Sequence, residues 1–250
     1  MINLSLLMIV RNGEGLVERS LDSVKELVDE MVVVDNGSTD NTIEIVKKYG
    51  ARVESNNDHD LGKLRKFGLE KTRGEWVMML DSDEVVSAEL SREIKDVVTR
   101  GSGVDGYFIP YQNHFLGKPL HRGGEDYKIL RLFRREAAMI DPALLHEKVT
   151  VHGKTEELKG KIYHYSYRSL KQVFGKFTAY GVRDARQRVA RGEKTSLKKI
   201  FMYPAHMFWA RYVEDKGYKD GLFRIPLDIG FAYMEFLSYF LIIFLKKEYE

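Results

Sequence analysis

Residues 31–40 read Met-Val-Val-Val-Asp-Asn-Gly-Ser-Thr-Asp, an apolar run that ends abruptly in a polar turn. Short β-branched runs of this kind are typical of buried strands. The Asn36-Gly37 pair predicts a tight turn, and residues 38–40 are favoured N-cap residues for a helix that continues from Ile43 to Gly50. The stretch therefore predicts a strand, a turn and a helix in succession.

The same alternation extends on both sides of this stretch. Before it, the apolar run Leu4–Val10 precedes a segment with helical spacing from Leu16; after it come a weak strand at 51–54, a helix at 64–71 and the apolar run Trp76–Leu80. Strands this apolar, alternating with helices, favour a parallel sheet buried on both faces. We therefore predict an α/β front.

The pattern changes after about residue 104. Three strands separated by turns are expected at 107–111, 128–133 and 161–165, and the chain then has helical character from Leu170 to its end. We predict a sheet domain over residues 1–167 and a helical region over 168–250. Interruptions of that helical region are expected near Pro204, Gly217, Gly221 and Pro226.

The charge is divided unevenly along the chain. Forty basic residues against 37 acidic ones give a net charge of +3, but residues 1–150 carry 21 against 26 and residues 151–250 carry 19 against 11. The absence of cysteine excludes disulfides, thiolate metal sites and cysteine nucleophiles, and it is compatible with a cytoplasmic location.

Polar clusters follow three of the predicted strands, at Arg11–Glu14, Asp35–Asp40 and Asp81–Glu84. Ligands of open α/β sheets bind beyond the carboxyl ends of the strands, so these clusters should converge on one rim. Asp35 could accept a hydrogen bond from a ribose, or it could form an Asx turn. A dinucleotide fingerprint and a P-loop are both missing.

Asp81-Ser82-Asp83 is the most informative of these segments. Two carboxylates two residues apart can share one hard divalent cation, which then binds substrate phosphates. Such a cation would neutralise a departing diphosphate. The alternative is a polar turn in which Ser82 and Asp83 cap a helix beginning near Val86.

These motifs together resemble glycosyltransferase family 2, and more narrowly its branch of lipopolysaccharide core glucosyltransferases and peptide S-glycosyltransferases. The motifs that carry the resemblance are Ser5–Val10 with Arg11-Asn12-x-Glu14, Val33–Thr42, Gly74-Glu75-Trp76 and Leu80–Glu84, and a thinner similarity continues through Leu130–Arg134 and Leu145–Val149.

The resemblance implies a GT-A fold (a Rossmann-like nucleotide-diphospho-sugar transferase), a UDP-hexose donor, inversion at the anomeric carbon, and Mg²⁺ or Mn²⁺ as cofactor. By position in the motifs, Asp83 would ligate the metal and Asp81 would contact ribose or metal. Lys66 stands where many members have an Asn after Arg65. The residues that would bind the nucleotide sugar are Arg11, Asn12, Glu14, Asp35, Arg65, Asp81 and Arg131.

Inversion needs one base on the acceptor side of the sugar. Family members often supply it from a Glu-Asp pair, and this chain has His146-Glu147 instead. We expect Glu147 to be the base and His146 to lie near the metal or the diphosphate. The alternative is a half-exposed pair without a catalytic role, and Asp60 and Asp126 compete for the part of base.

Residues 154–200 contain 13 Lys or Arg against four acids, interleaved with aromatic residues. We rank contact with an anionic membrane or glycolipid first, a solvated helix face second and nucleic acid third. The apolar stretch Ile229–Leu245 is at the lower limit for a membrane span and contains Glu235, so it favours a buried or interfacial helix. The region could also form a homo-oligomer.

The sequence thus predicts an inverting, metal-dependent glycosyltransferase, peripheral on the inner face of the membrane, that acts on a glycolipid or lipopolysaccharide-type acceptor. A peptide or protein glycosyltransferase on the same fold remains an alternative. A nucleotide-binding partner protein without catalysis is the rival from another class.

Overall fold

The computed structural model describes residues 3–58, 60–101, 103–140 and 149–245. The chain forms two compact units: unit 1 comprises Met1–Tyr111 and Tyr127–His164, and unit 2 comprises Gln112–Asp126 and Tyr165–Glu250. Residues 112–126 thus group with the C-terminal helices. The two units are described separately below.

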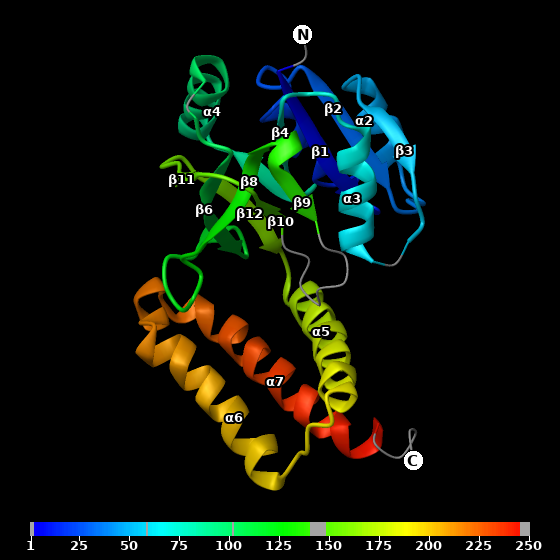
Figure 1. Ribbon diagram of the computed structural model, residues 1–250. Helices are drawn as coiled ribbons and strands as arrows, with labels where there is room; N and C mark the ends of the chain where they lie inside the picture. The colour runs from blue at the N-terminus through cyan, green and yellow to red at the C-terminus, as the bar shows by residue number, and fades with distance from the viewer. Residues whose placement is uncertain (1–2, 59, 102, 141–148, 246–250) are drawn as a thin grey trace. The chain divides into compact units, whose positions relative to one another are not determined.

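The N-terminal half of unit 1 is a parallel sheet in which β1 lies between β2 and β4 (Figure 1). The strand order β3-β2-β1-β4 means that the chain leaves β1 in one direction and later returns to its other side. This reversal creates a topological switch point, where α/β proteins bind ligands. The four strands are β1 (Leu4–Val10), β2 (Glu30–Asp35), β3 (Arg52–Ser55) and β4 (Trp76–Met79).

Antiparallel strands extend the sheet beyond β4 in the order β8-β6-β12-β5. They are β8 (Lys128–Arg134), β6 (Gly106–Phe115), β12 (Ile162–Tyr167) and β5 (Glu84–Val86). The short strands β7 (Lys118–Pro119) and β11 (Thr155–Glu157) pair with β6, and β9 (Ala138–Ile140) pairs with β10 (Val149–Val151) in a separate ribbon.

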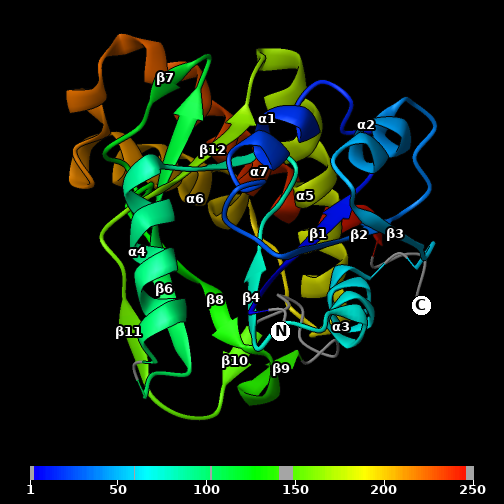
Figure 2. The ribbon, with the colours of Figure 1, turned by 90° about the horizontal axis from the view of Figure 1, so that it is seen from above.

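Helices cover both faces of the parallel strands, because alternate side chains of β1 point in opposite directions. Leu6 and Met8 pack in a core with α1 (Val17–Asp22), α2 (Thr42–Lys48) and α4 (Ala88–Arg100). Leu7 packs in a second core that includes Leu64 of α3 (Leu61–Lys71). Figure 2 shows α3 on the side of the sheet opposite α1 and α2. The predicted parallel sheet, buried on both faces, is confirmed.

The helix expected near Val86 is present, but Ser82 and Asp83 do not cap it. Residues 84–86 form β5, which pairs with β12, and the helix begins at Ala88. Ser87 is its N-cap and accepts a hydrogen bond from the Leu90 amide at 3.1 Å. Residues 82–83 thus form the polar turn that the alternative expected, but they do not cap this helix.

Unit 2 contains the helices α5 (Leu170–Ala190), α6 (Leu197–Trp209) and α7 (Ile225–Leu245). α7 packs against both α5 and α6, as Figure 1 shows. At Gly230 the helices α5 and α7 approach closely: a Cβ there would lie 2.7 Å from the ring of Phe177. The predicted helical C-terminal region is confirmed.

The predicted interruption at Pro204 is wrong, since α6 runs through this residue. Pro204 is buried and the chain instead turns around Gly217 and Gly221, in two short 3-10 segments. Pro226 lies in the first turn of α7, where a proline removes no intrahelical hydrogen bond. Pro204 therefore shows that packing of a helix can outweigh one missing backbone donor.

Within the described ranges one helical stretch, Leu222–Leu245, is long and apolar enough to cross a membrane by length and composition. About a third of it is buried within the protein. Glu235 in its middle lies 3.6 Å from Arg188 of α5, which gives this carboxylate a partner inside unit 2.

A buried ionic network ties residues 112–126 to the helices of unit 2. The guanidinium of Arg224, fully buried, donates to Asp228 Oδ2 at 2.8 Å and to the carbonyl of Gly123 at 2.9 Å. Glu125 accepts from Arg211 and, at 2.7 Å, from Asn113. Because buried charges need such partners, the network explains why this segment groups with the helices.

Candidate functional site

The three polar clusters that follow β1, β2 and β4 meet at one rim of the sheet. The amide of Gly13 donates to Thr42 Oγ1 at 2.8 Å, and the amide of Glu14 donates to Asp40 Oδ2 at 3.2 Å. A Cβ on Gly13 would lie 3.3 Å from Ser82 Oγ. The predicted convergence at the carboxyl ends of the strands is thus confirmed, at the switch point of the sheet.

Several of the predicted nucleotide-sugar residues also hold this rim together. Asn12 Oδ1 accepts from the amide of Thr39 at 2.7 Å, and Glu14 Oε1 accepts from the side-chain amide of Asn41 at 2.8 Å. Asp35 Oδ1 accepts from the amide of Ser38 at 3.0 Å, which is the Asx-type turn expected as an alternative. Arg11 is exposed beside them.

The centre of the rim is a buried ionic cluster around Arg131. Its Nη2 lies 2.8 Å from both Asp81 Oδ2 and Glu84 Oε1, and its Nε donates to the hydroxyl of Tyr111. The same Tyr111 hydroxyl donates to Glu84 Oε1 at 2.8 Å. Arg65 of α3 approaches the other oxygen of Asp81, at 3.7 Å. The structure therefore brings Arg65, Asp81 and Arg131 together.

Arg131 reaches this position because β8 is irregular at that point. The pairing of β6 with β8 passes from Tyr107–Leu132 to Phe108–Leu130, which leaves Arg131 as an extra residue on β8. A β-bulge of this kind turns a side chain away from its regular direction and is common next to active sites.

Burial and charge act in opposite directions on the acids of this cluster. Burial alone would raise the pKa of Asp81, but the positive charges of Arg131 and Arg65 hold it well below its usual range. Burial raises the pKa of Glu84, although Arg131 opposes the shift. Burial also raises the pKa of Tyr111. At neutral pH the cluster thus holds an ionised Asp81 against a permanent cation.

Asp83 lies beside a histidine that the sequence did not indicate. His164 Nε2 is 3.5 Å from Asp83 Oδ2, and both side chains are about one fifth exposed. Burial lowers the pKa of His164, but the hydrogen bond to Asp83 and the negative charges of Asp83, Glu84 and Asp81 together outweigh burial, so the net shift is upward. The antiparallel register of β5 and β12 places His164 opposite Glu84 and hence next to Asp83.

Among the described residues of the rim, a divalent cation would have its ligands completed by a substrate. In the described part of the chain, no group of three or more His, Cys, Asp or Glu side chains is arranged to hold a metal. Asp83 and His164 supply one carboxylate and one imidazole, and cations such as Mg²⁺ are commonly held by one or two carboxylates plus substrate phosphates. The donor set therefore fits a nucleotide-bound cation.

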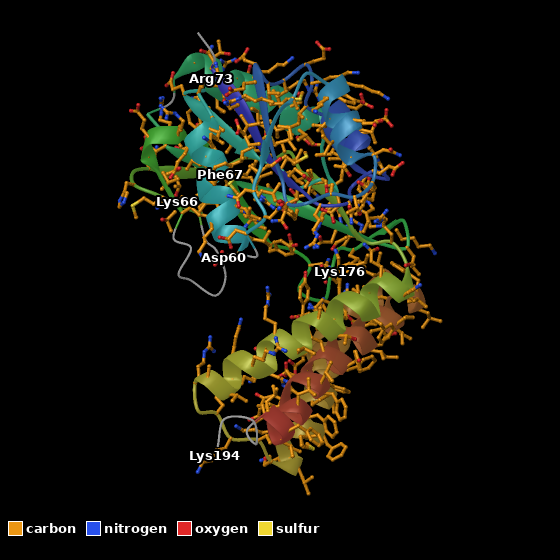
Figure 3. The ribbon with its side chains drawn as sticks, turned by 90° about the vertical axis from the view of Figure 1, so that its right-hand side faces the viewer. Asp60, Lys66, Phe67, Arg73, Lys176 and Lys194 are labelled. Carbon is orange, nitrogen blue, oxygen red and sulfur yellow. The ribbon has the colours of Figure 1, made fainter. Side chains whose placement is uncertain are left out.

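Glu147, the predicted base, and its neighbour His146 lie outside the described residues, in the range 141–148. The competitor Asp60 serves as the N-cap of α3, with Oδ1 accepting from the Gly62 amide at 2.7 Å (Figure 3). Lys66 lies further along this helix. The other competitor, Asp126, belongs to unit 2.

A cavity of about 680 Å³ adjoins the ionic cluster. Arg65 and Arg131 both line it, so it is continuous with the side chains that hold Asp81. Its remaining lining is largely apolar, with one further cation, Lys128. The apolar side chains are Met79, Phe108, Ile129, Leu130, Val149 and Val151.

Comparison with known proteins identifies relatives of this chain. The sequence model of the family described as "Glycosyl transferase family 2" matches residues 5–150. An uncharacterized glycosyltransferase of Rickettsia typhi is 30% identical over 225 residues, which cover 84% of this chain and 75% of the relative. The lipopolysaccharide core biosynthesis glycosyltransferase LpsC of Rhizobium meliloti is 23% identical, over 90% of this chain and 84% of LpsC.

Among solved structures, TarS of S. aureus (residues 1–349) superposes with a TM-score of 0.51 at 16% identity. The superposition covers 100% of this chain and 92% of TarS. A second structure of the same TarS fragment contains UDP. The likeness shows that the fold is GT-A, as predicted.

Proposed function

Since the chain belongs to glycosyltransferase family 2, and is therefore a glycosyltransferase, we propose that it transfers a hexose from a UDP-sugar with inversion, in a reaction that requires Mg²⁺ or Mn²⁺. The observation that carries the proposal is the rim itself, where the Arg131–Asp81 ion pair and the Asp83–His164 pair lie at the switch point of the sheet. UDP bound to TarS supports the choice of nucleotide.

Asp83 and His164 are the residues that would hold the cation. Both oxygens of Asp81 already face guanidinium groups, at 2.8 Å from Arg131 and 3.7 Å from Arg65. Asp81 therefore keeps these two arginines oriented, and their charge supports the diphosphate. When bound, the cation would neutralise the diphosphate leaving group. Asp35 and the Arg11–Glu14 segment would contact the nucleoside.

The acceptor would enter the cavity that adjoins the cluster. An apolar floor with cations at Arg65, Arg131 and Lys128 suits an amphipathic acceptor that carries phosphate or carboxylate groups. We therefore propose a glycolipid of the lipopolysaccharide core type, presented at the cytoplasmic face of a membrane. The similarity to LpsC is consistent with this acceptor class.

A thermal-shift panel of UDP, GDP and CDP, each with Mn²⁺ or with EDTA, tests the donor and the metal. A ligand that binds the folded state raises the melting temperature. We expect UDP with Mn²⁺ to give the largest shift. If no nucleotide raises the melting temperature, the proposed donor class is wrong.

Substitutions test the metal ligands separately. Asp83→Asn and His164→Gln should each weaken Mn²⁺-dependent UDP binding at least about tenfold in calorimetric titration, as loss of metal-site residues generally does. Asp96→Asn on α4, at an exposed position, is the matched control and should bind like the wild type. Unchanged binding by both site variants would refute the assignment.

Transfer assays with a UDP-hexose donor distinguish the acceptors. We expect transfer to lipopolysaccharide core acceptors rather than to peptides, and NMR of the product should show an inverted anomeric configuration. Transfer to a peptide alone would favour the protein glycosyltransferase alternative.

A further inference from the structure

The exposed side of α6 carries an apolar stripe that unit 2 leaves uncovered. The α6 stripe consists of Phe201, Met202, Ala205 and Trp209, which recur at helical spacing and are all exposed. Phe201, Met202 and Trp209 are 64%, 57% and 54% exposed. Leu197, at the start of the helix, is 75% exposed. Scattered apolar residues are common on protein surfaces, but a continuous stripe along one helix marks an interaction site.

Packing within unit 2 does not account for these side chains. The opposite side of α6 carries the buried residues Ile200 and Pro204. Ile200 packs in a core with Tyr239 and Ile242 of α7. α6 therefore has two apolar sides. One packs against α7 in the core of unit 2, and the other, the α6 stripe, is exposed.

The charges around the stripe indicate what covers it. Residues 194–209, which include the whole of α6, contain Lys194, Lys198 and Lys199 and no Asp or Glu. Lys198 lies three residues before Phe201 and so on the same side of the helix. Lys194 lies in the loop that leads into α6 (Figure 3). The stripe is thus apolar and aromatic with basic residues at its N-terminal end.

We infer that the α6 stripe docks the protein onto a bilayer that contains anionic lipids. Phe, Met and Trp side chains on one face, with lysines beside them, are the composition of helices that lie in the membrane interface. Trp is favoured at that depth because its ring is apolar and its N–H is polar. Lysines extend their charge to the headgroups.

A second copy of the chain suits the stripe less well. Parallel pairing of two identical stripes would bring the same basic residues together, and like charges across an interface oppose association. Antiparallel pairing would set the basic residues of each copy against a stretch, residues 194–209, that contains no Asp or Glu. Anionic headgroups instead neutralise Lys194 and Lys198. The inference builds on the proposed function, because a glycolipid acceptor would lie in a membrane. Its test measures vesicle binding and no catalysis, so membrane docking and the proposed function can each fail without the other.

Sedimentation of the full chain with vesicles tests the inference. We expect binding to phosphatidylcholine vesicles containing about 30% phosphatidylglycerol and little binding to phosphatidylcholine alone, with binding reduced at least about tenfold by high salt. Trp209 reports on the contact, because the chain has two tryptophans and Trp76 is 1% exposed. Its fluorescence should shift to shorter wavelength on anionic vesicles.

Two pairs of substitutions, each with a matched control, test the surface itself. Phe201→Ser with Met202→Ser, and separately Lys194→Glu with Lys198→Glu, should each weaken vesicle binding at least about tenfold. The controls change exposed apolar residues and exposed lysines of unit 1 and should bind like the wild type. They are Leu61→Ser with Met139→Ser, and Lys47→Glu with Lys48→Glu.

Three results would overturn the inference. The first is equal binding to neutral and anionic vesicles, and the second is unchanged binding by both variant pairs. The third is a blue shift of Trp209 without lipid that grows with protein concentration, together with a dimer mass in light scattering. That outcome would assign the α6 stripe to self-association.

Discussion

At the scale of single residues, Arg131 is the side chain on which the site depends most. It is a buried arginine between Leu130 and Leu132 of β8, and its guanidinium contacts Asp81, Glu84 and the Tyr111 hydroxyl. A buried charge is tolerated only when its partners are in place, so the three groups and Arg131 stabilise one arrangement together. The site is therefore held in position before any ligand binds.

Replacement of Arg131 should affect both stability and activity. Arg131→Met leaves the buried Glu84 and the partly exposed Asp81 without this cation, which should cost about 3–5 kcal/mol of unfolding free energy. Urea denaturation measures this loss. Arg134→Met on the same strand is the control: its partner Glu75 is more than half exposed, so it should cost about 1 kcal/mol or less. Equal losses in the two variants would show that the cluster does not stabilise the fold.

Glu235 predicts a dependence of stability on pH. Burial raises its pKa above the ordinary value of 4.5, although Arg188 opposes the shift. A carboxyl group with a raised pKa in the folded state binds more protons there, so stability falls as pH rises from about 4.5 through the folded pKa. Glu235→Gln lacks this loss. Its melting temperature should equal that of the wild type near about pH 4 and exceed it by about 1–3 °C at neutral pH. A variant less stable at neutral pH would contradict the assignment.

At the scale of helices and strands, local patterns predicted more than long-range pairings did. The apolar runs of β1, β2 and β4 identified the parallel sheet because their signal lies within each segment. His164 could not be found in this way, since its place beside Asp83 follows from the register of β5 and β12. The direction of Arg131 depends on a bulge that no local pattern indicates. Sequence therefore located the rim but not all of its side chains.

The close approach of α5 and α7 gives a prediction at the same scale. Gly230→Val places side-chain atoms against the ring of Phe177, where even a Cβ would lie 2.7 Å away. Overpacking of this kind should lower the free energy of unfolding by about 1–3 kcal/mol. Gly175→Ala on α5 is the control: nothing lies within 4 Å of its Cβ position, so the change should stabilise the helix by about 0.5–1 kcal/mol. Thermal denaturation followed by circular dichroism measures both.

At the scale of the whole molecule, the chain has two compact units with separate cores. The residues of the Arg131 cluster and of the Asp83–His164 pair all belong to unit 1, whereas the α6 stripe and the buried Arg224 network belong to unit 2. The sequence predicted a single boundary at residue 167, whereas residues 112–126 group with the helices. This grouping depends on ion pairs between distant segments, such as the pair of Glu125 and Arg211, which no local pattern indicates.

Because the two units have separate cores, we predict that each has its own unfolding transition. Nucleotide binding should then change the transition of unit 1, and the packing of α7 should change that of unit 2. UDP with Mn²⁺ should stabilise unit 1 by mass action, by about 2.7 kcal/mol at a hundred times the dissociation constant. Gly230→Val should lower the stability of unit 2. In scanning calorimetry the variant should therefore show an early transition that UDP does not move and a later one that UDP raises. A single transition that responds in full to both changes would mean that the two units unfold as one cooperative body, and the separate cores would then not confer separate stability.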